Sequence, residues 1–185
     1  MKGIIFCLLE KMVVTHGGAD AWDRLVRQTP LKTVGGGFLG PATYPDEDLF
    51  ALVGTASAMT GQPVGELMRA FARFIFPDLM RVSPLFAPIG MTAKHFLMSV
   101  DRVIHVEVRK LHPEANLPYF DYEDPGSDRL VVLYRSPRDL CDMVPGLIEG
   151  ASEYFGEGIE QVHVKCVRDG HPHCRFELRF TPGAP

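Results

Sequence analysis

The sequence is 185 residues long, with 46% hydrophobic and 23% charged residues, a balance that excludes disordered, collagen-like and coiled-coil chains. Nineteen Lys and Arg against 23 Asp and Glu give a formal net charge of −4. Since no long basic run is present, nucleic acid is not expected as a partner. The length suits one domain over residues 1–185 and leaves little room for a separate catalytic module.

The first segment, MKGIIFCLLEKMVV, contains a short apolar run that Glu10 and Lys11 interrupt. It lacks a small-residue cleavage site, so it predicts a helix and not a signal peptide. No stretch reaches the roughly 18 apolar residues that a membrane span needs, and we expect a cytoplasmic protein with no membrane partner. Four cysteines allow two disulfides, but a core-rich chain without an export signal gains little from them, so thiol or metal chemistry is expected.

Helices are predicted over the first part of the chain, about residues 1–112, because apolar residues recur there at helical spacing. Asp46, directly after Pro45, is the predicted N-cap of one of them. The last segment also shows some strand-like alternation, and we favour a helix there. The predicted helices cover about residues 4–13, 22–26, 46–53, 64–75 and 92–111.

The second part, about residues 113–185, is richer in aromatic and β-branched residues, which favour strands. Segments 117–123 and 129–135 predict a hairpin, and 159–167 with 174–180 predict a second one. Between them, Ser136, Pro137 and Asp139 predict a capped start for a helix that runs toward Gly156. The fold class is therefore α+β, with a helical N-terminal half and a roughly four-stranded antiparallel sheet crossed by one helix.

A donor-rich segment follows the predicted strand 129–135. Tyr134, Ser136 and Arg138 offer two hydroxyls and one guanidinium within five residues, which suits a ligand with two carboxylates, such as the propionates of haem. The alternative is that Ser136 is only an N-cap, Tyr134 an aromatic residue at a strand end and Arg138 a solvated charge.

Several segments spread over the whole chain match one known family. They are MKGIIF, Trp22–Asp23, the stretch from Tyr44 through Leu52–Val53 to Thr60–Gly61, H-x-x-V-x-K-x-x-P-x-A-x-x-P-x-F from His105 to Phe120, and Y-x-S-x-R from Tyr134 to Arg138. With them the sequence resembles the H-NOX (haem nitric-oxide/oxygen binding) domains, in particular bacterial stand-alone members.

The resemblance implies a gas sensor and not an enzyme, with haem b held between the two halves. It implies that His105 is the iron ligand, that Tyr134, Ser136 and Arg138 bind the propionates, and that Pro118 presses on the porphyrin and distorts it. No C-x-x-C-H occurs, so the haem is expected to be held non-covalently.

Without the resemblance, the residues support His105 as the iron ligand less strongly, because the chain has seven histidines and His95 and His112 are alternative candidates. His105 is flanked by Ile104 and Val106, which suits an imidazole in an apolar pocket, whereas His112 is followed by a proline that ends a helix.

The preference among gases is predicted from one position. The resemblance implies that oxygen-binding members carry a tyrosine five residues after the arginine of Y-x-S-x-R, and here that residue is Met143. A thioether donates no hydrogen bond to bound O₂, so nitric oxide is the expected ligand, with CO as a second one. Further candidates for the pocket wall, each explained equally well as core, are Ile5, Phe74, Phe76 and Leu147.

A second constellation consists of Cys141, His163, Cys166 and Cys174. Three thiolates and one imidazole form a closed tetrahedral set typical of structural zinc. His171 and His173 compete with His163, whose spacing from Cys166 needs a bulge or turn to bring both to one face. A subset of bacterial H-NOX proteins is similar at the four positions and binds zinc there. Cys7 remains and is predicted to be a small buried residue.

The predicted function is a nitric oxide sensor in which NO weakens the iron–histidine bond and changes the shape of the domain. The resemblance implies that the partner is a separate histidine kinase or an enzyme of cyclic-di-GMP synthesis or degradation. The alternative is a zinc-stapled interaction domain or thiol redox sensor without functional haem.

Overall fold

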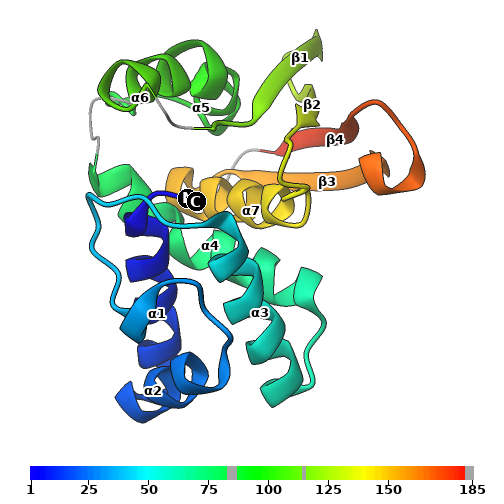
Figure 1. Ribbon diagram of the computed structural model, residues 1–185. Helices are drawn as coiled ribbons and strands as arrows, with labels where there is room; N and C mark the ends of the chain where they lie inside the picture. Colours follow the sequence, from blue (N-terminus) through cyan, green and yellow to red (C-terminus); the bar gives the residue numbers. More distant parts are fainter. Residues whose placement is uncertain (83–86, 114–115, 182–185) are drawn as a thin grey trace.

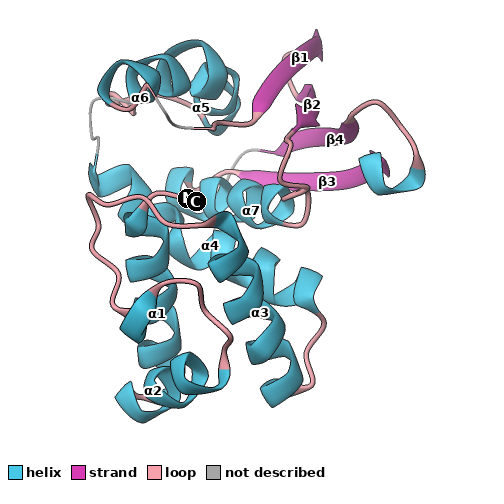
Figure 2. Cartoon of the chain, in the orientation of Figure 1, coloured by secondary structure: helices cyan, strands magenta, loops and turns pink. Residues whose placement is uncertain are grey.

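The computed structural model describes residues 1–82, 87–113 and 116–181 (Figure 1). Helices fill the first part of the chain, and a sheet with one long helix fills the second (Figure 2). The helices of the first part are α1 (Gly3–Gly17), α2 (Ala19–Gln28), α3 (Asp46–Thr60), α4 (Val64–Val82), α5 (Ala93–Ser99) and α6 (His105–Leu111), with short turns at η1 (Val34–Gly36) and η3 (Val100–Ile104).

The sheet contains β1 (Tyr119–Gly126), β2 (Arg129–Arg135), β3 (Gly158–Lys165) and β4 (Cys174–Thr181) in the order β1-β2-β4-β3, with every pair antiparallel. Helix α7 (Met143–Phe155) crosses between the two hairpins, and the turn η4 (Val167–Asp169) joins β3 to β4. On β4 the alternate side chains Phe176, Leu178 and Phe180 are buried as predicted. The α+β prediction is confirmed.

Helices α4 and α7 pack closely because two glycines of α7 face α4. A Cβ atom on Gly146 would lie 2.0 Å from the Arg69 carbonyl oxygen, and one on Gly150 would lie 2.4 Å from Cβ of Phe76. Neither position has room for a side chain, so the two helices meet nearly backbone to backbone.

This helix pair joins two apolar cores. The first lies among α1, α2, α3 and the N-terminal part of α4, and includes Phe6, Leu49 and Phe71. The second lies among α5, α7, the C-terminal part of α4 and the sheet, and includes Phe96 and Phe176. In Figure 1, α1–α3 gather at the bottom, α5 and α6 lie at the top beside β1, and α4 and α7 lie between them.

The segment from Thr92 to Leu111 is helical, as predicted, but it is not one uniform helix. A π-turn, η3, separates α5 from α6, and the His105 amide donates to the Val100 carbonyl five residues earlier. Such turns widen the helix and rotate the residues that follow, and they are common at functional sites. His105 is the first residue of α6.

Two local predictions were wrong. Helix α3 begins at Asp46 and its N-cap is Pro45, so Asp46 is not the cap; its carboxylate lies 2.5 Å from the Met1 ammonium. Helix α7 begins at Met143 and not beside Ser136. Ser136 accepts a 3.2 Å hydrogen bond from the Arg138 amide in a turn, and Asp139 has a φ of 49°, a left-handed conformation that a continuous helix cannot contain.

Asp48 fixes the loop after α2 against α3. Its buried carboxylate accepts hydrogen bonds from the Lys32 amide at 2.7 Å, the Thr33 amide at 3.0 Å and the Thr33 hydroxyl at 2.5 Å. Burial raises the pKa of Asp48, but the hydrogen bonds from Thr33 and Lys32 outweigh it, and the pKa lies below its usual value. The charged form is therefore the one that stabilises the fold.

We expect Asp48→Ala to lower the free energy of unfolding by about 3 kcal/mol, because it leaves three donors without their acceptor. Asp48→Asn should be less stable than the wild type at pH values above the unfolded-state pKa of Asp48. This difference in stability should shrink as the pH falls through the lower folded-state pKa, because the wild-type carboxylate then becomes protonated. Urea titrations at several pH values measure this difference. A stability difference independent of pH would contradict the assignment.

Within the described ranges, no helix combines the length and the apolar character needed to cross a membrane.

Candidate functional site

A cavity of about 880 Å³ lies between the two halves of the molecule. One wall comes from α1, α4 and α7, and the other comes from the segment α5–η3–α6 together with β1. Its size is within the range of pockets that hold drug-sized ligands and cofactors.

His105 lies on the second wall. Its Nδ1 is 3.0 Å from Oδ1 of Asp101, one helical turn earlier, and its ring packs against Phe120 with centroids 5.7 Å apart. Burial lowers the pKa of His105, while Asp101 acts in the opposite direction. A neutral imidazole with Nδ1 directed at a carboxylate presents Nε2 as its metal-binding nitrogen, the arrangement that second-shell carboxylates create in metal sites.

Arg138 lies on the cavity wall. Its Nε is 2.9 Å from Oδ2 of Asp46, and its Nη2 donates to the Asn116 carbonyl. The guanidinium thus already faces a carboxylate at this site, which is the chemistry that a propionate would use.

The other two residues of the Y-x-S-x-R segment are buried, Tyr134 to 3% exposure and Ser136 to 8%. Tyr134 packs on Phe120 with ring centroids 5.2 Å apart, and burial raises its pKa to about 12, which the Ser136 hydroxyl opposes. Of Tyr134, Ser136 and Arg138, only Arg138 lines the cavity.

Of the other residues predicted for the pocket, some line the cavity and some do not. Ile5, Phe76 and Leu147 line the cavity. Phe74 and Met143 pack against the core of α1–α4 instead, and Pro118, half-buried before β1, lies beside the wall residues Leu117 and Phe120.

The wall formed by α1, α4 and α7 is entirely apolar in its described side chains. The lining residues from these helices include Ile5 of α1, Met80 of α4, and Val144 and Leu147 of α7. No side chain of this wall can donate a hydrogen bond to a molecule in the cavity.

The family model described as Haem-NO-binding matches residues 2–163. The chain belongs to the H-NOX family. H-NOX domains are sensor domains that bind haem and gases such as NO and CO, and they are not catalytic.

Solved H-NOX structures share the fold along the whole chain. An H-NOX protein from S. oneidensis in the Fe(II)NO state has a TM-score of 0.90 and 29% identity, covering 98% of this chain and 99% of its own. An unliganded Fe(II) H-NOX protein from K. algicida has a TM-score of 0.90 and 27% identity, covering 100% of this chain and 99% of its own.

Curated relatives are longer. Soluble guanylate cyclase 89Db of Drosophila melanogaster is 25% identical over 160 residues, which are 84% of this chain and 24% of that protein. Soluble guanylate cyclase 89Da is 24% identical over 187 residues, which are 99% of this chain and 28% of that protein. The chain spans about a quarter of the length of these relatives.

The cavity fits the haem that the family binds. Its volume of about 880 Å³ is sufficient, its opposite wall is apolar, His105 offers an imidazole nitrogen, and the Arg138 guanidinium offers a partner for a carboxylate.

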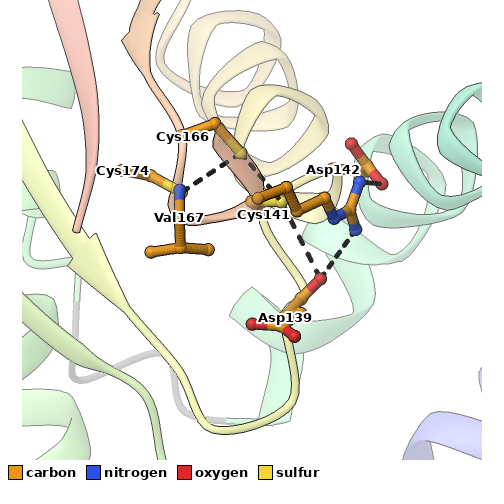
Figure 3. Close-up of polar contacts among 7 residues, drawn as sticks. Asp139, Cys141, Asp142, Cys166, Val167 and Cys174 are labelled. Atoms are coloured by element: carbon orange, nitrogen blue, oxygen red, sulfur yellow. Dashed lines mark hydrogen bonds and ion pairs between the residues drawn. The ribbon is translucent and has the colours of Figure 1, made fainter. Parts of the chain in front are cut away.

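A second site of this H-NOX domain lies at the start of α7. Sγ of Cys166 is 3.8 Å from Sγ of Cys141 and 3.9 Å from Sγ of Cys174, and all three sulfurs lie within 4.8 Å of one another (Figure 3). These separations exclude disulfide bonds. Tetrahedral zinc with Zn–S bonds of about 2.3 Å places its sulfurs about 3.8 Å apart, so the three thiols fit that ion.

Arg168 lies beside this cluster. Its Nη1 is 2.7 Å from Oδ2 of Asp142, and its Nη2 donates to the Asp139 carbonyl at 2.8 Å. Burial raises the pKa of Cys141 to about 12, and Arg168 acts to lower it. The Cys141 thiol therefore stays protonated without a cation, and a metal ion would displace its proton.

The structure does not bring His163 into the three-sulfur group. Its ring is exposed and stacks on Phe176 with centroids 4.1 Å apart. The pairing of β3 with β4 shifts between His163 and Lys165, an irregularity of the predicted kind, but it does not bring His163 to the sulfurs.

Three candidate residues were missed in the sequence. Asp101 could have been found, because a carboxylate four residues before a helical histidine lies on the same face. Asp46, predicted only as a cap, lies near Arg138 solely through the fold. Arg168 carries no local signal, because its contacts lie 26 and 29 residues away.

Proposed function

We propose that this H-NOX domain is a haem-based sensor selective for nitric oxide, and that it regulates a separate signalling protein. The observation that supports the proposal is the cavity itself, with His105 on one wall, its Nδ1 held by Asp101, and only apolar side chains on the wall from α1, α4 and α7. We also propose that residues 1–185 act as one domain.

When bound, haem b supplies a ferrous iron that takes NO. In the proposal His105 ligates this iron through Nε2 while Asp101 holds Nδ1. Arg138, Tyr134 and Ser136 bind the propionates, for which Arg138 would exchange its contact with Asp46. Pro118, next to the wall, would press on the macrocycle, and Ile5 and Leu147 would shape the side where the gas enters. Met143, predicted for the same side, packs in the core of α1–α4 instead.

NO bound at the haem would weaken the bond that His105 would make to the iron. Since His105 is the first residue of α6 and follows the π-turn η3, release of its side chain would free that segment to move against β1. A partner that prefers one of the two shapes converts gas binding into a signal. We propose a histidine kinase or an enzyme of cyclic-di-GMP metabolism as that partner, in the cytoplasm.

Selectivity for NO over O₂ follows from the apolar wall. Bound O₂ gains from a hydrogen-bond donor, whereas NO binds ferrous iron strongly without one. We expect the reduced protein to form no stable O₂ complex in air. Leu147→Gln, which places an amide on this wall, should raise the affinity of the reduced protein for O₂ at least tenfold, about 1.4 kcal/mol. Leu147→Met, of similar volume and without a donor, should leave the O₂ affinity unchanged, and absorption spectra recorded over a range of O₂ pressures measure both. An equal effect of both variants would contradict this reading.

Zinc is proposed as a second, structural cofactor. Cys141, Cys166 and Cys174 would supply three ligands, and their sulfur separations support this. His163 is the proposed fourth ligand, with His171 and His173 as alternatives. Such a site joins the start of α7 to the β3–β4 hairpin.

The decisive experiment is the absorption spectrum of the reduced protein before and after addition of NO. The proposal predicts a strong haem band in the reduced protein and, with NO, a spectrum characteristic of iron that has lost its histidine. Colourless protein after expression with ample haem would instead favour the zinc-stapled interaction or thiol redox domain, whose supporting observation is the same three-cysteine cluster.

A further inference from the structure

Arg109 of α6 makes a contact that the proposed mechanism does not use. Its Nη2 lies 3.6 Å from Oδ1 of Asp101, the same oxygen that lies 3.0 Å from Nδ1 of His105. A guanidinium and an imidazole N–H therefore compete for the negative charge on one carboxylate oxygen. Among the described residues, His105 and Arg109 are the ion-pair partners of Asp101.

The contact between Asp101 and Arg109 depends on the irregular turn between α5 and α6. In a regular α-helix, residues eight apart are separated by about 12 Å along the axis, and side chains pair three or four residues apart. Asp101 lies within the π-turn η3, whose closing hydrogen bond spans five residues, and a wider turn advances less along the axis per residue. The Arg109 side chain, directed toward the N-terminal end of its helix, then reaches past His105 to the carboxylate.

The exposure of the three side chains argues against a purely structural role for Arg109. The His105 side chain is 12% exposed, that of Asp101 24% and that of Arg109 40%. An ion pair with so exposed a partner contributes little to stability. A cation in contact with a carboxylate nonetheless reduces the negative charge that the carboxylate offers to its other hydrogen-bond partner.

We propose that Arg109 is a positioning residue for His105, and that it sets, through the Asp101 carboxylate, how strongly the imidazole binds iron. This inference rests on the proposed function, because that function assigns His105 to the iron. Arg109 is not among the described residues that line the cavity, so it acts through Asp101. With a cation at Oδ1, Asp101 pulls less on the Nδ1 proton, and the imidazole is a weaker ligand. The bond that NO would break is weakened in advance.

The test is the iron–histidine stretching band in the resonance Raman spectrum of the reduced protein. Substitutions at a side chain as exposed as Arg109 usually change stability little, so the variants should fold. Arg109→Gln removes the charge and should move the band to higher frequency. Arg109→Glu should move it further in the same direction, and Arg109→Lys, which keeps the charge, should leave it close to its wild-type position. In the NO complex of Arg109→Gln, the ratio of the histidine-bound to the histidine-free form should rise roughly twofold, the size expected for a partly exposed ion pair.

A double-substitution cycle tests whether the effect passes through Asp101. Asp101→Asn should move the band to lower frequency, and adding Arg109→Gln to it should have no further effect. An unshifted band in Arg109→Gln, or a shift of equal size in the Asp101→Asn background, would overturn the inference.

The matched control is Arg102→Gln. It removes the same charge from an exposed arginine next to Asp101 in the sequence, and within the described part of the chain Arg102 forms no ion pair with that carboxylate. The band should stay in place. Equal shifts in Arg102→Gln and Arg109→Gln would trace the effect to overall charge and contradict the inference. A wild-type protein without any haem band would instead overturn the proposed function, so the two failures are distinguishable.

Discussion

His105→Gly should abolish stable haem binding, and added imidazole should restore it. The substitution removes the side chain whose Nδ1 faces Asp101 at 3.0 Å on the cavity wall, leaving a space that free imidazole can fill. We expect the haem content after purification to fall at least tenfold, about 1.4 kcal/mol in binding free energy. The haem band of the reduced protein, recorded with and without imidazole, measures the effect.

The matched control is His112→Gly. His112 lines the same cavity two helical turns further along, at the end of α6, so loss of a cavity-facing imidazole is common to both variants. The His112 variant should keep its haem band without imidazole. If His112→Gly lost the haem and His105→Gly retained it, the proposed iron ligand would be wrong.

Cys174→Ser should remove one equivalent of zinc per chain and destabilise the fold. Structural zinc contributes on the order of 10 kcal/mol to the folding of small peptides, and less in a chain with two apolar cores of its own. If the loss is about 3 kcal/mol, the melting temperature of a chain of this size should fall by roughly 10 °C. Metal analysis and thermal unfolding measure the two effects.

Two comparisons distinguish the loss of zinc from the loss of ordinary packing when the buried Cys174 is replaced. Cys7→Ser changes the half-buried thiol of α1, which contacts the Phe38 carbonyl far from the cluster, and should leave the zinc in place. A chelator should lower the melting temperature of the wild type toward that of Cys174→Ser and leave the variant unchanged. Well under one equivalent of metal in the wild type would remove the site.

The order of elements could be predicted because local signals carry it. Apolar spacing and glycines mark α1 through α4, and the alternation of Phe176, Leu178 and Phe180 marks the last strand. The start of α7 could not be predicted, because the capping pattern at Ser136 also fits the turn that the chain adopts.

The candidate sites were predictable to a similar degree. The cysteines were found because their residue type limits their chemistry, and the fold brings three of them together. Asp46 could not be found as a site residue, because it matters only through Arg138, a neighbour distant in sequence. That contact depends on how the start of α3 lies against the turn between β2 and α7, and the sequence spacing does not encode it.

The shift in pairing between His163 and Lys165 has a second consequence, for solubility. Strand β3 is a free edge of the sheet, and its Val162 and Val164 are 62% and 46% exposed. A long, regular edge with exposed valines invites another chain to add a strand and start aggregation. The bulge interrupts the regular edge just where the chain turns toward Cys166. One irregularity therefore both directs the cysteine toward α7 and discourages the sheet from growing into a neighbouring molecule.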